Sequence, residues 1–312
     1  MTPEALVYVA GHRGLAGSAI VRALQARGYQ NILTRTKTEL DLTIQAATDA
    51  FFAAHRPEFV ILAAAKVGGI LANATYPADF ITDNLLIQTH VIDAAHRHAT
   101  QRLLFLGSSC IYPRDCPQPI REEYLLTGPL EPTNAPYALA KIAGIAHCHA
   151  LNTQHHTRYL PVMPTNLYGP HDNFDPHSAH VLPALIARFH HAKLTAAPHV
   201  TLWGSGTPRR EFLHADDLAT ACLHLLEHTD ETRLLNIGTA QDLPILELAH
   251  LIADIVGYQG DIVLDPTKPD GTPQKLLDTT RIQALGWTPT ISLEKGIEQT
   301  YSWFQQNVLS TP

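Results

Sequence analysis

Residues 6–24 read LVYVAGHRGLAGSAIVRAL and determine the class of fold. An apolar run is followed by glycines at positions 11, 14 and 17, and the apolar residues after them recur at helical spacing. Glycines permit a tight turn and let a pyrophosphate approach the backbone at the positive end of a helix. Glycines also occur in ordinary strand-to-helix connections, but their place after the first predicted strand favours a phosphate-binding loop.

The first half of the chain repeats this alternation of a short apolar run with a longer helical pattern. The predicted strands are Leu6–Val9, Asn31–Leu33, Phe59–Leu62 and Arg102–Leu106. Helical patterns follow them, up to about Gly28 and over 44–55, 80–98 and 137–155. Because right-handed crossovers place each helix over the strands, this alternation predicts an α/β fold with a doubly wound parallel sheet of Rossmann type.

The pattern changes after about residue 165, where prolines become frequent. Further helical patterns cover 181–191, 246–256 and about 293–307. We expect a dinucleotide-binding domain over residues 1–167, to which segments near 212–240 return. Residues 168–312 are expected to form mainly a smaller substrate-binding domain.

The composition argues against several classes of protein. The 312 residues include 22 Lys and Arg and 29 Asp and Glu, a net charge of −7, so nucleic acid is not an expected partner. The four cysteines form no CxxC pair, and histidines such as His147 and His149 lack zinc-site spacing, so no metal is expected. No apolar run reaches the roughly 18 residues of a membrane span, and Glu4 lies where an export signal is positive. We expect a cytoplasmic protein without membrane contacts.

Charges after the second predicted strand bear on the choice of dinucleotide. Residues 34–37 read TRTK, where NAD-specific proteins usually carry an acid that binds the ribose. Together with Arg13 in the glycine loop, Arg35 and Lys37 favour the 2′-phosphate of NADP. The alternative is that Arg35 and Lys37 are ordinary solvated charges. Asp41 either contacts the adenine or caps the next helix.

A tyrosine and a lysine lie one helical turn apart in the sequence Tyr137-Ala-Leu-Ala-Lys141. This spacing places both side chains on one helix face, where the ammonium favours ionisation of the phenol for proton relay. The pair often arises by chance, but Ser108 follows the fourth predicted strand at the sheet edge where ligands bind. We therefore expect Ser108, Tyr137 and Lys141 to act on one substrate oxygen.

Eight stretches of the chain carry a resemblance to a known family. They are GHRGLAGSAI, LAAAKVGGI, YPADFI, LFLGSSCIYP, LEPTNAPYALAKIAGI, VMPTNLYGPHDNF, WGSGTPRREFLH and KPDGTPQKLLD. These stretches resemble those of the GDP-L-fucose synthases, which are extended short-chain dehydrogenases/reductases, and the similarity runs from about residue 6 to the last helix. The resemblance implies epimerisation of GDP-4-keto-6-deoxy-D-mannose at C3 and C5, followed by NADPH-dependent reduction at C4 to GDP-L-fucose. The C4 ketone acidifies both neighbouring C–H bonds, so the two reactions are compatible in one pocket.

The resemblance also implies the roles of particular residues. Ser108, Tyr137 and Lys141 would serve reduction, whereas Cys110 would be the base and His180 the acid of epimerisation. The implied cofactor contacts are Gly11, His12, Arg13, Gly14, Leu15, Ala16, Gly17, Arg35, Lys37, Asp41, Leu42, Ala64, Leu106, Gly107, Ser108, Ser109, Lys141, Pro164, Thr165, Asn166, Leu167 and His180. The implied substrate contacts are Arg188, Trp203, Arg210, Asp270 and Lys275, of which three are cations suited to a diphosphate. Lys37 lies where the family tends to have arginine, which weakens a bidentate phosphate contact.

Two other functions were weighed against this one. A nucleotide-sugar epimerase or dehydratase with tightly bound NAD would consume no NADPH, and a redox sensor that binds NADP would typically lack the Tyr137 and Lys141 pair. The apolar faces of residues 85–95 and 142–151 are suited to pairing across a twofold axis as a four-helix bundle. We therefore expect a homodimer.

Overall fold

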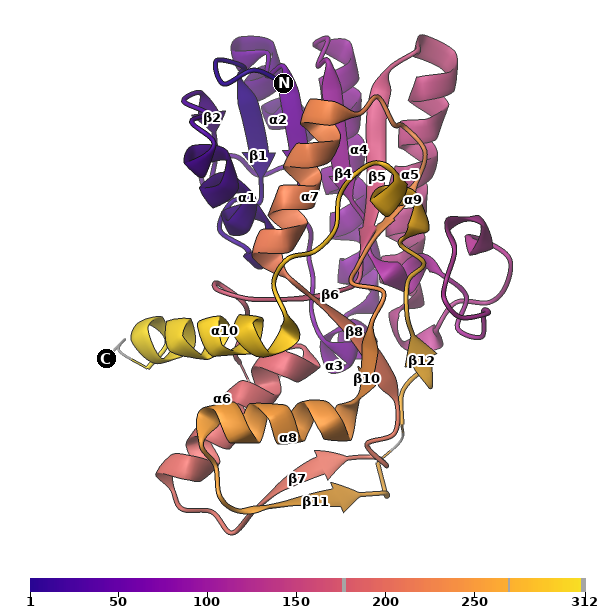
Figure 1. Cartoon of the computed structure of the whole chain (residues 1–312). Coiled ribbons are helices and arrows are strands. Elements are labelled where there is room, and N and C mark those ends of the chain that lie inside the picture. Colours follow the sequence, from indigo (N-terminus) through magenta and orange to yellow (C-terminus); the bar gives the residue numbers. More distant parts are fainter. Residues whose placement is uncertain (176–177, 269, 310–312) are drawn as a thin grey trace.

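A six-stranded parallel sheet forms the larger part of the computed structural model, which describes residues 1–175, 178–268 and 270–309. The strands are β1 (Val7–Ala10), β2 (Ile32–Leu33), β3 (Phe59–Leu62), β4 (Arg102–Leu106), β5 (Arg158–Pro164) and β9 (Leu235–Ile237). Their order is β2-β1-β3-β4-β5-β9, and all five pairings are parallel (Figure 1). The predicted α/β class with a doubly wound sheet is therefore confirmed.

Helices cover both faces of this sheet. Val7 and Val9 point to one face, which α1 (Leu15–Ala26) and α7 (Ala215–His228) cover. Tyr8 and Ala10 point to the opposite face. That face is covered by α2 (Gln45–His55), α4 (Pro77–Arg97) and α5 (Ala135–His155). Because both faces are buried, the strands are continuous apolar runs rather than alternating ones.

The smaller part is built around β8 (Arg209–His214). This strand pairs with β6 (Asn166–Tyr168), β10 (Asp242–Pro244) and β12 (Gln274–Lys275). A separate parallel pair consists of β7 (His199–Trp203) and β11 (Asp261–Asp265). The smaller part has its own apolar core, which lies among α6 (Val181–Leu194), α8 (Ile245–Val256) and α10 (Leu293–Asn307) (Figure 1). These are the three late helices that the sequence predicts.

The chain crosses between the two parts more than once. It enters the smaller part through β6, directly after β5, and returns to the larger part with α7 and β9. A short helix, α9 (Thr280–Ala284), also returns, and its Ile282 is buried on the face that α1 and α7 cover. The connections between the parts therefore gather near the carboxyl ends of the central strands, where Rossmann-type sheets bind ligands.

Shorter elements complete this edge. They are α3 (Ile70–Thr75) and the 3₁₀ helices η1 (Ser109–Ile111), η2 (Glu122–Tyr124) and η3 (Pro132–Asn134). Within the described ranges, no helix is both long and apolar enough to span a membrane. Over the same residues, no group of three or more His, Cys, Asp and Glu side chains is arranged to hold a metal ion.

Candidate active site

The glycine loop between β1 and α1 is packed too tightly for side chains. A Cβ on Gly11 would lie 2.7 Å from the backbone nitrogen of Ala64, and one on Gly17 would overlap the carbonyl oxygen of Gly11. Gly14 is the N-cap of α1, and no side-chain hydrogen bond caps this helix within the described chain. In the same part of the structure, Nδ1 of His12 is buried without a partner. Uncapped N–H groups at the positive end of a helix fit the pyrophosphate of a dinucleotide.

Arg13 and Arg35 lie near the carboxylate of Glu39, which follows β2 in the chain. Nη1 of Arg35 donates to the carbonyl of Thr34 at 2.7 Å, and its guanidinium lies 5.6 Å from the ring centre of Phe51. Hydrogen bonds from Thr36 lower the pKa of Glu39, and the charges of Arg35 and Arg13 lower it further. Glu39 is thus an acid near both arginines that the sequence analysis did not single out.

Asp41 forms a local turn before α2. Its Oδ1 accepts hydrogen bonds from the backbone nitrogen and the hydroxyl of Thr43, at 2.9 and 2.7 Å. The N-cap of α2 is Ile44, so the alternative that Asp41 caps this helix was wrong. The hydrogen bonds from Thr43 lower the pKa of Asp41, and the positive charge of Lys37 lowers it further.

The other predicted cofactor residues lie around the carboxyl ends of β1, β4 and β5. Leu15 and Ala16 begin α1, and Leu42 is buried under α2 and α4. The backbone nitrogen of Gly107 donates to the carbonyl of Val162 at 2.8 Å, which joins the ends of β4 and β5. Ser109 is buried in η1. These positions form one continuous edge with the glycine loop.

Ser108, Tyr137 and Lys141 meet at this edge because α5 lies directly on β4. Gly144 permits the approach, since a Cβ there would collide with the ring of Phe105. Nζ of Lys141 donates to the carbonyl of Leu106 at 2.9 Å and lies 5.8 Å from the ring centre of Tyr137. Burial raises the pKa of Tyr137 and the Ser108 side chain opposes this rise, which indicates that Ser108 lies close to the tyrosine.

Burial is the largest influence on the pKa values of Tyr137 and Lys141. It lowers the pKa of Lys141 to about 8 and raises the pKa of Tyr137 well above its ordinary value. Cys110 raises the pKa of Tyr137 further, and the hydrogen bond with Ser108 opposes the rise. The expected depression of the Tyr137 pKa by Lys141 is therefore not found. At neutral pH Tyr137 is a phenol that can donate a proton.

Cys110, His180 and Lys275 come from three distant segments, and the charge of Lys275 acts on both of the other groups. Cys110 lies in η1 and is 7% exposed, whereas His180 is the N-cap of α6. Burial raises the pKa of the Cys110 thiol, and the charge of Lys275 opposes this rise. The surrounding protein lowers the pKa of His180, and Lys275 lowers it further. The Lys275 ammonium therefore lies near both groups.

Two of the predicted substrate residues are brought together by strand pairing. Lys275 on β12 is the register partner of Arg210 on β8. Nη1 of Arg210 donates to the carbonyls of Arg209 and Thr272, at 2.7 and 2.6 Å. These contacts hold two cations side by side, an arrangement suited to a diphosphate.

The remaining substrate residues lie around β7. Nη1 of Arg188 donates to the carbonyl of Thr201 at 2.9 Å, and Trp203 is 64% exposed at the end of the strand. Asp270 accepts hydrogen bonds from the backbone nitrogen and the hydroxyl of Ser205, at 2.9 and 2.7 Å. A Cβ on Gly204 would collide with the Asp270 carboxylate, so Asp270 lies against the residue that follows Trp203.

Glu211 is a positioning residue that the sequence analysis missed. Its side chain is fully buried on β8, beside Arg210, and accepts hydrogen bonds from the backbone nitrogens of Thr239, Ala240 and Leu277, at 2.6, 2.8 and 3.0 Å. Its carbonyl accepts the side-chain amide of Asn166 at 2.8 Å. Glu211 thus connects the predicted cofactor stretch 164–167 with the segment that carries Lys275. Glu211 directly follows Arg209 and Arg210 in RREFLH, so no apolar pattern around it singled it out.

Comparisons with known proteins show the family of the chain. Residues 7–238 match the NAD dependent epimerase/dehydratase family. The putative GDP-L-fucose synthase 2 of Arabidopsis thaliana is 57% identical over 306 residues, which are 98% of this chain and 93% of that protein. The GDP-L-fucose synthase of Escherichia coli (strain K12) is 55% identical over 310 residues, covering 96% of this chain and 97% of that protein.

Solved structures extend the comparison to cofactor complexes. A GDP-L-fucose synthetase from Naegleria fowleri bound to NADP has a TM-score of 0.91 at 26% identity, over 99% of this chain and 97% of that one. A GDP-mannoheptose C4 reductase from Campylobacter jejuni with NADP bound has a TM-score of 0.90 at 37% identity, over 98% and 99%. The chain therefore belongs to the NAD dependent epimerase/dehydratase family and, within it, to the GDP-L-fucose synthases.

Proposed function

We propose that this enzyme converts GDP-4-keto-6-deoxy-D-mannose to GDP-L-fucose by epimerisation at C3 and C5 and NADPH-dependent reduction at C4. The observation that carries the proposal is the meeting of two sets of reactive groups at one sheet edge. Ser108 opposes the burial-driven rise in the pKa values of both Tyr137 and Cys110, and its Oγ accepts a hydrogen bond from the backbone nitrogen of Cys110 at 3.4 Å. The relatives named GDP-L-fucose synthase support the choice of substrate.

The glycine loop and the basic residues after β2 are proposed to hold NADPH. The uncapped N-terminus of α1 suits the pyrophosphate, and Arg13, Arg35 and Lys37 suit the 2′-phosphate. Lys141 anchors the carboxyl end of β4 beside Tyr137, where the nicotinamide would lie. When bound, NADPH supplies the hydride that reduces C4.

In reduction, Tyr137 and Ser108 are proposed to bind the C4 oxygen. The raised pKa of Tyr137 keeps its proton in place at neutral pH, so the phenol can donate it as the C4 oxygen becomes an alkoxide. Nζ of Lys141 lies 5.8 Å from the tyrosine ring centre; it does not depress the Tyr137 pKa in the free chain, and we propose that its charge offsets the phenolate only as the proton leaves. The same two hydroxyls stabilise the enolate oxygen formed during epimerisation.

In epimerisation, Cys110 is proposed to remove the proton from C3 or C5, and His180 to return one to the opposite face. The active pair is a thiolate and an imidazolium. In the free chain, burial favours the neutral thiol, and the surrounding protein and the charge of Lys275 favour the neutral imidazole. The sulfur must therefore lose a proton and His180 must gain one before each inversion. The charge of Lys275 lowers the pKa of Cys110 and so favours its ionisation.

The GDP portion is proposed to lie across β7, β8 and β12. Arg210 and Lys275 are register neighbours and suit the diphosphate together with Arg188. Trp203 is exposed and offers a flat surface for the guanine or the sugar. Asp270, adjoining Gly204, is placed to accept a hydrogen bond from the same ligand.

We also propose a homodimer formed through α4 and α5. Leu86 and Leu139 are exposed on these helices, at 37% and 48%, and Ala143 and Ala146 extend the apolar face of α5. Pairing of two such faces would bury them in a four-helix bundle. Leu139→Glu should shift the protein toward monomer in sedimentation equilibrium. A cytoplasmic location is proposed as well, consistent with four cysteines that are free thiols.

The decisive experiment is incubation with GDP-4-keto-6-deoxy-D-mannose and NADPH, followed by identification of the product by NMR. We expect stoichiometric loss of NADPH absorbance and a product inverted at C3 and C5. Turnover without net NADPH consumption would instead support an epimerase or dehydratase that retains its cofactor.

A further inference from the structure

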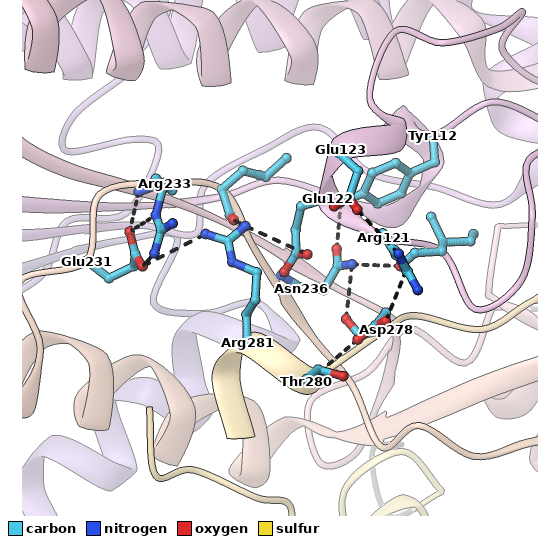
Figure 2. Close-up of polar contacts among 12 residues, drawn as sticks. Tyr112, Arg121, Glu122, Glu123, Glu231, Arg233, Asn236, Asp278, Thr280 and Arg281 are labelled. Atoms are coloured by element: carbon cyan, nitrogen blue, oxygen red, sulfur yellow. Dashed lines mark hydrogen bonds and ion pairs between the residues drawn. The ribbon is translucent and has the colours of Figure 1, made fainter. Parts of the chain in front are cut away.

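A buried polar network lies behind the candidate site, centred on Asn236 of β9 (Figure 2). The side chain of Asn236 is fully buried, and its Oδ1 accepts a hydrogen bond from the hydroxyl of Tyr112 at 2.6 Å. Its Nδ2 donates to the carbonyls of Ile120 and Asp278, at 2.9 and 3.2 Å. The backbone nitrogen donates to Oε1 of Glu122 at 3.0 Å. One residue thus joins the end of η1, residues 120–122 and the segment around Asp278.

The first of these segments carries Cys110. Tyr112 is the C-cap of η1, two residues after Cys110, and its backbone nitrogen bonds back to the carbonyl of Ser109. The Tyr112 ring is buried in the core beneath α4 and α5. The hydrogen bond to Asn236 therefore ties the end of η1, two residues from the thiol, to β9.

The second and third segments carry Lys275 and the residues that hold it. Ile120 pairs with the chain just after Lys275, because its nitrogen donates to the carbonyl of Leu276 at 2.7 Å and its carbonyl accepts from Asp278 at 2.8 Å. Asn236 bonds to the carbonyls of both Ile120 and Asp278. The same amide that anchors the Cys110 turn therefore also anchors the segment of Lys275.

Only an amide of this size meets all of these requirements. The side chain at position 236 must accept a hydrogen bond from Tyr112 and donate two to carbonyl oxygens, and an asparagine amide can do both. An aspartate would place a charge against two carbonyl oxygens, and a leucine would leave every partner unsatisfied.

We propose that Tyr112 and Asn236 are positioning residues for epimerisation, which hold the thiol of Cys110 at a defined place relative to Lys275. This inference rests on the proposed role of Cys110. Neither residue belongs to the reducing set. Lys141 is held through the carbonyl of Leu106, Tyr137 lies on α5, and Ser108 is at the other end of η1, two residues after β4. Loss of the Tyr112 hydrogen bond should therefore impair proton removal at C3 and C5 more than reduction at C4.

The test compares Tyr112→Phe with Tyr159→Phe. Each change removes one buried hydroxyl, but the hydroxyl of Tyr159 has no hydrogen-bond partner in the described part of the chain. Proton removal is measured in D₂O with the keto sugar nucleotide and NADP⁺, as the rate at which deuterium enters C3 and C5. Reduction is measured with NADPH, and the product is separated into inverted and uninverted GDP-6-deoxy sugars. Thermal melts confirm that each variant is folded at the assay temperature.

For Tyr112→Phe we expect deuterium exchange to fall about tenfold, which corresponds to about 1.4 kcal/mol on the barrier, with more uninverted product. Tyr159→Phe should keep the wild-type ratio of exchange to reduction. This ratio does not depend on the amount of folded enzyme, so a general loss of stability cannot change it. An unchanged ratio in Tyr112→Phe, or an equal change in both variants, would overturn the proposal.

Cys110→Ser in the same exchange assay separates this inference from the proposed function. If Cys110→Ser exchanges at the wild-type rate, the role of Cys110 fails and the inference fails with it. If Cys110→Ser loses exchange while Tyr112→Phe keeps the wild-type ratio, only the positioning role of Tyr112 and Asn236 is refuted.

Discussion

The two halves of the candidate site are built in different ways. Ser108, Tyr137 and Lys141 come from the end of β4 and one turn of α5, and the packing of α5 on β4 is enough to bring them together. Cys110, His180 and Lys275 come from η1, the start of α6 and β12. The segments of Cys110 and Lys275 are bonded to the buried polar residues Asn236 and Glu211. The reducing half is therefore a local structure, whereas the epimerising half exists only when both parts of the molecule are assembled.

The sharpest way to separate the halves is Cys110→Ser. A serine hydroxyl is a far weaker base than a thiolate, so deuterium exchange at C3 and C5 should fall by about 10³-fold or more. Cofactor binding should remain, and the variant should slowly yield a GDP-6-deoxy sugar with unchanged C3 and C5. Deuterium entering both carbons at the wild-type rate would assign the base to another residue.

The second test removes the proton donor of the reducing half. Tyr137→Phe should lower NADPH-dependent turnover by roughly 10²-fold, because the developing C4 alkoxide loses its proton donor. The dissociation constant for NADPH, measured by fluorescence titration, should change little. Turnover close to that of the wild type would exclude Tyr137 as the donor.

The cofactor pocket gives a smaller expected effect. We expect NADPH to be preferred over NADH by at least about tenfold, or about 1.4 kcal/mol. Changing both Arg35 and Lys37 to glutamine should reduce the preference for NADPH, mainly because NADPH binding becomes weaker. Arg158→Gln is the matched control, because Arg158 is exposed at the opposite end of β5. Equal use of both cofactors by the wild type would contradict the role of these cations.

The smallest effect is expected from Lys275→Met, measured as the pH dependence of exchange at saturating substrate. In the proposed mechanism, activity requires a protonated His180 and an ionised Cys110. Because the pKa of His180 is lowered and that of Cys110 is raised, the imidazole loses its proton at a lower pH than the thiol. The acid limb of the profile therefore follows the pKa of His180, and the alkaline limb follows that of Cys110. Because Lys275 lowers both pKa values, its loss should move both limbs to higher pH, by up to about one unit. The height of the plateau should change little. An acid limb that stays in place would show that Lys275 does not act on His180.

Much of the fold followed from local patterns. The glycine loop, the helices ending near His155 and Val256, and the strands β1, β3 and β4 all lie where the sequence indicated. The return of α9 to the larger part was not indicated, because a five-residue helix has too few residues to show a period. The Tyr137 pKa was also misjudged, since the spacing to Lys141 reveals a neighbouring charge but not the burial that outweighs it.

The sequence by itself determined the class of fold, the phosphate loop and the Tyr137 and Lys141 pair, because each depends on residues within one or two turns of chain. Only the tertiary structure decided that Lys275 lies near both Cys110 and His180, and that Asn236 and Glu211 hold the segments around them. A hydrogen bond between residues more than 100 positions apart, such as that of Tyr112 with Asn236, leaves no periodic signal in the sequence. Its partners are chosen by the packing of β9 against β5, which only the folded chain specifies.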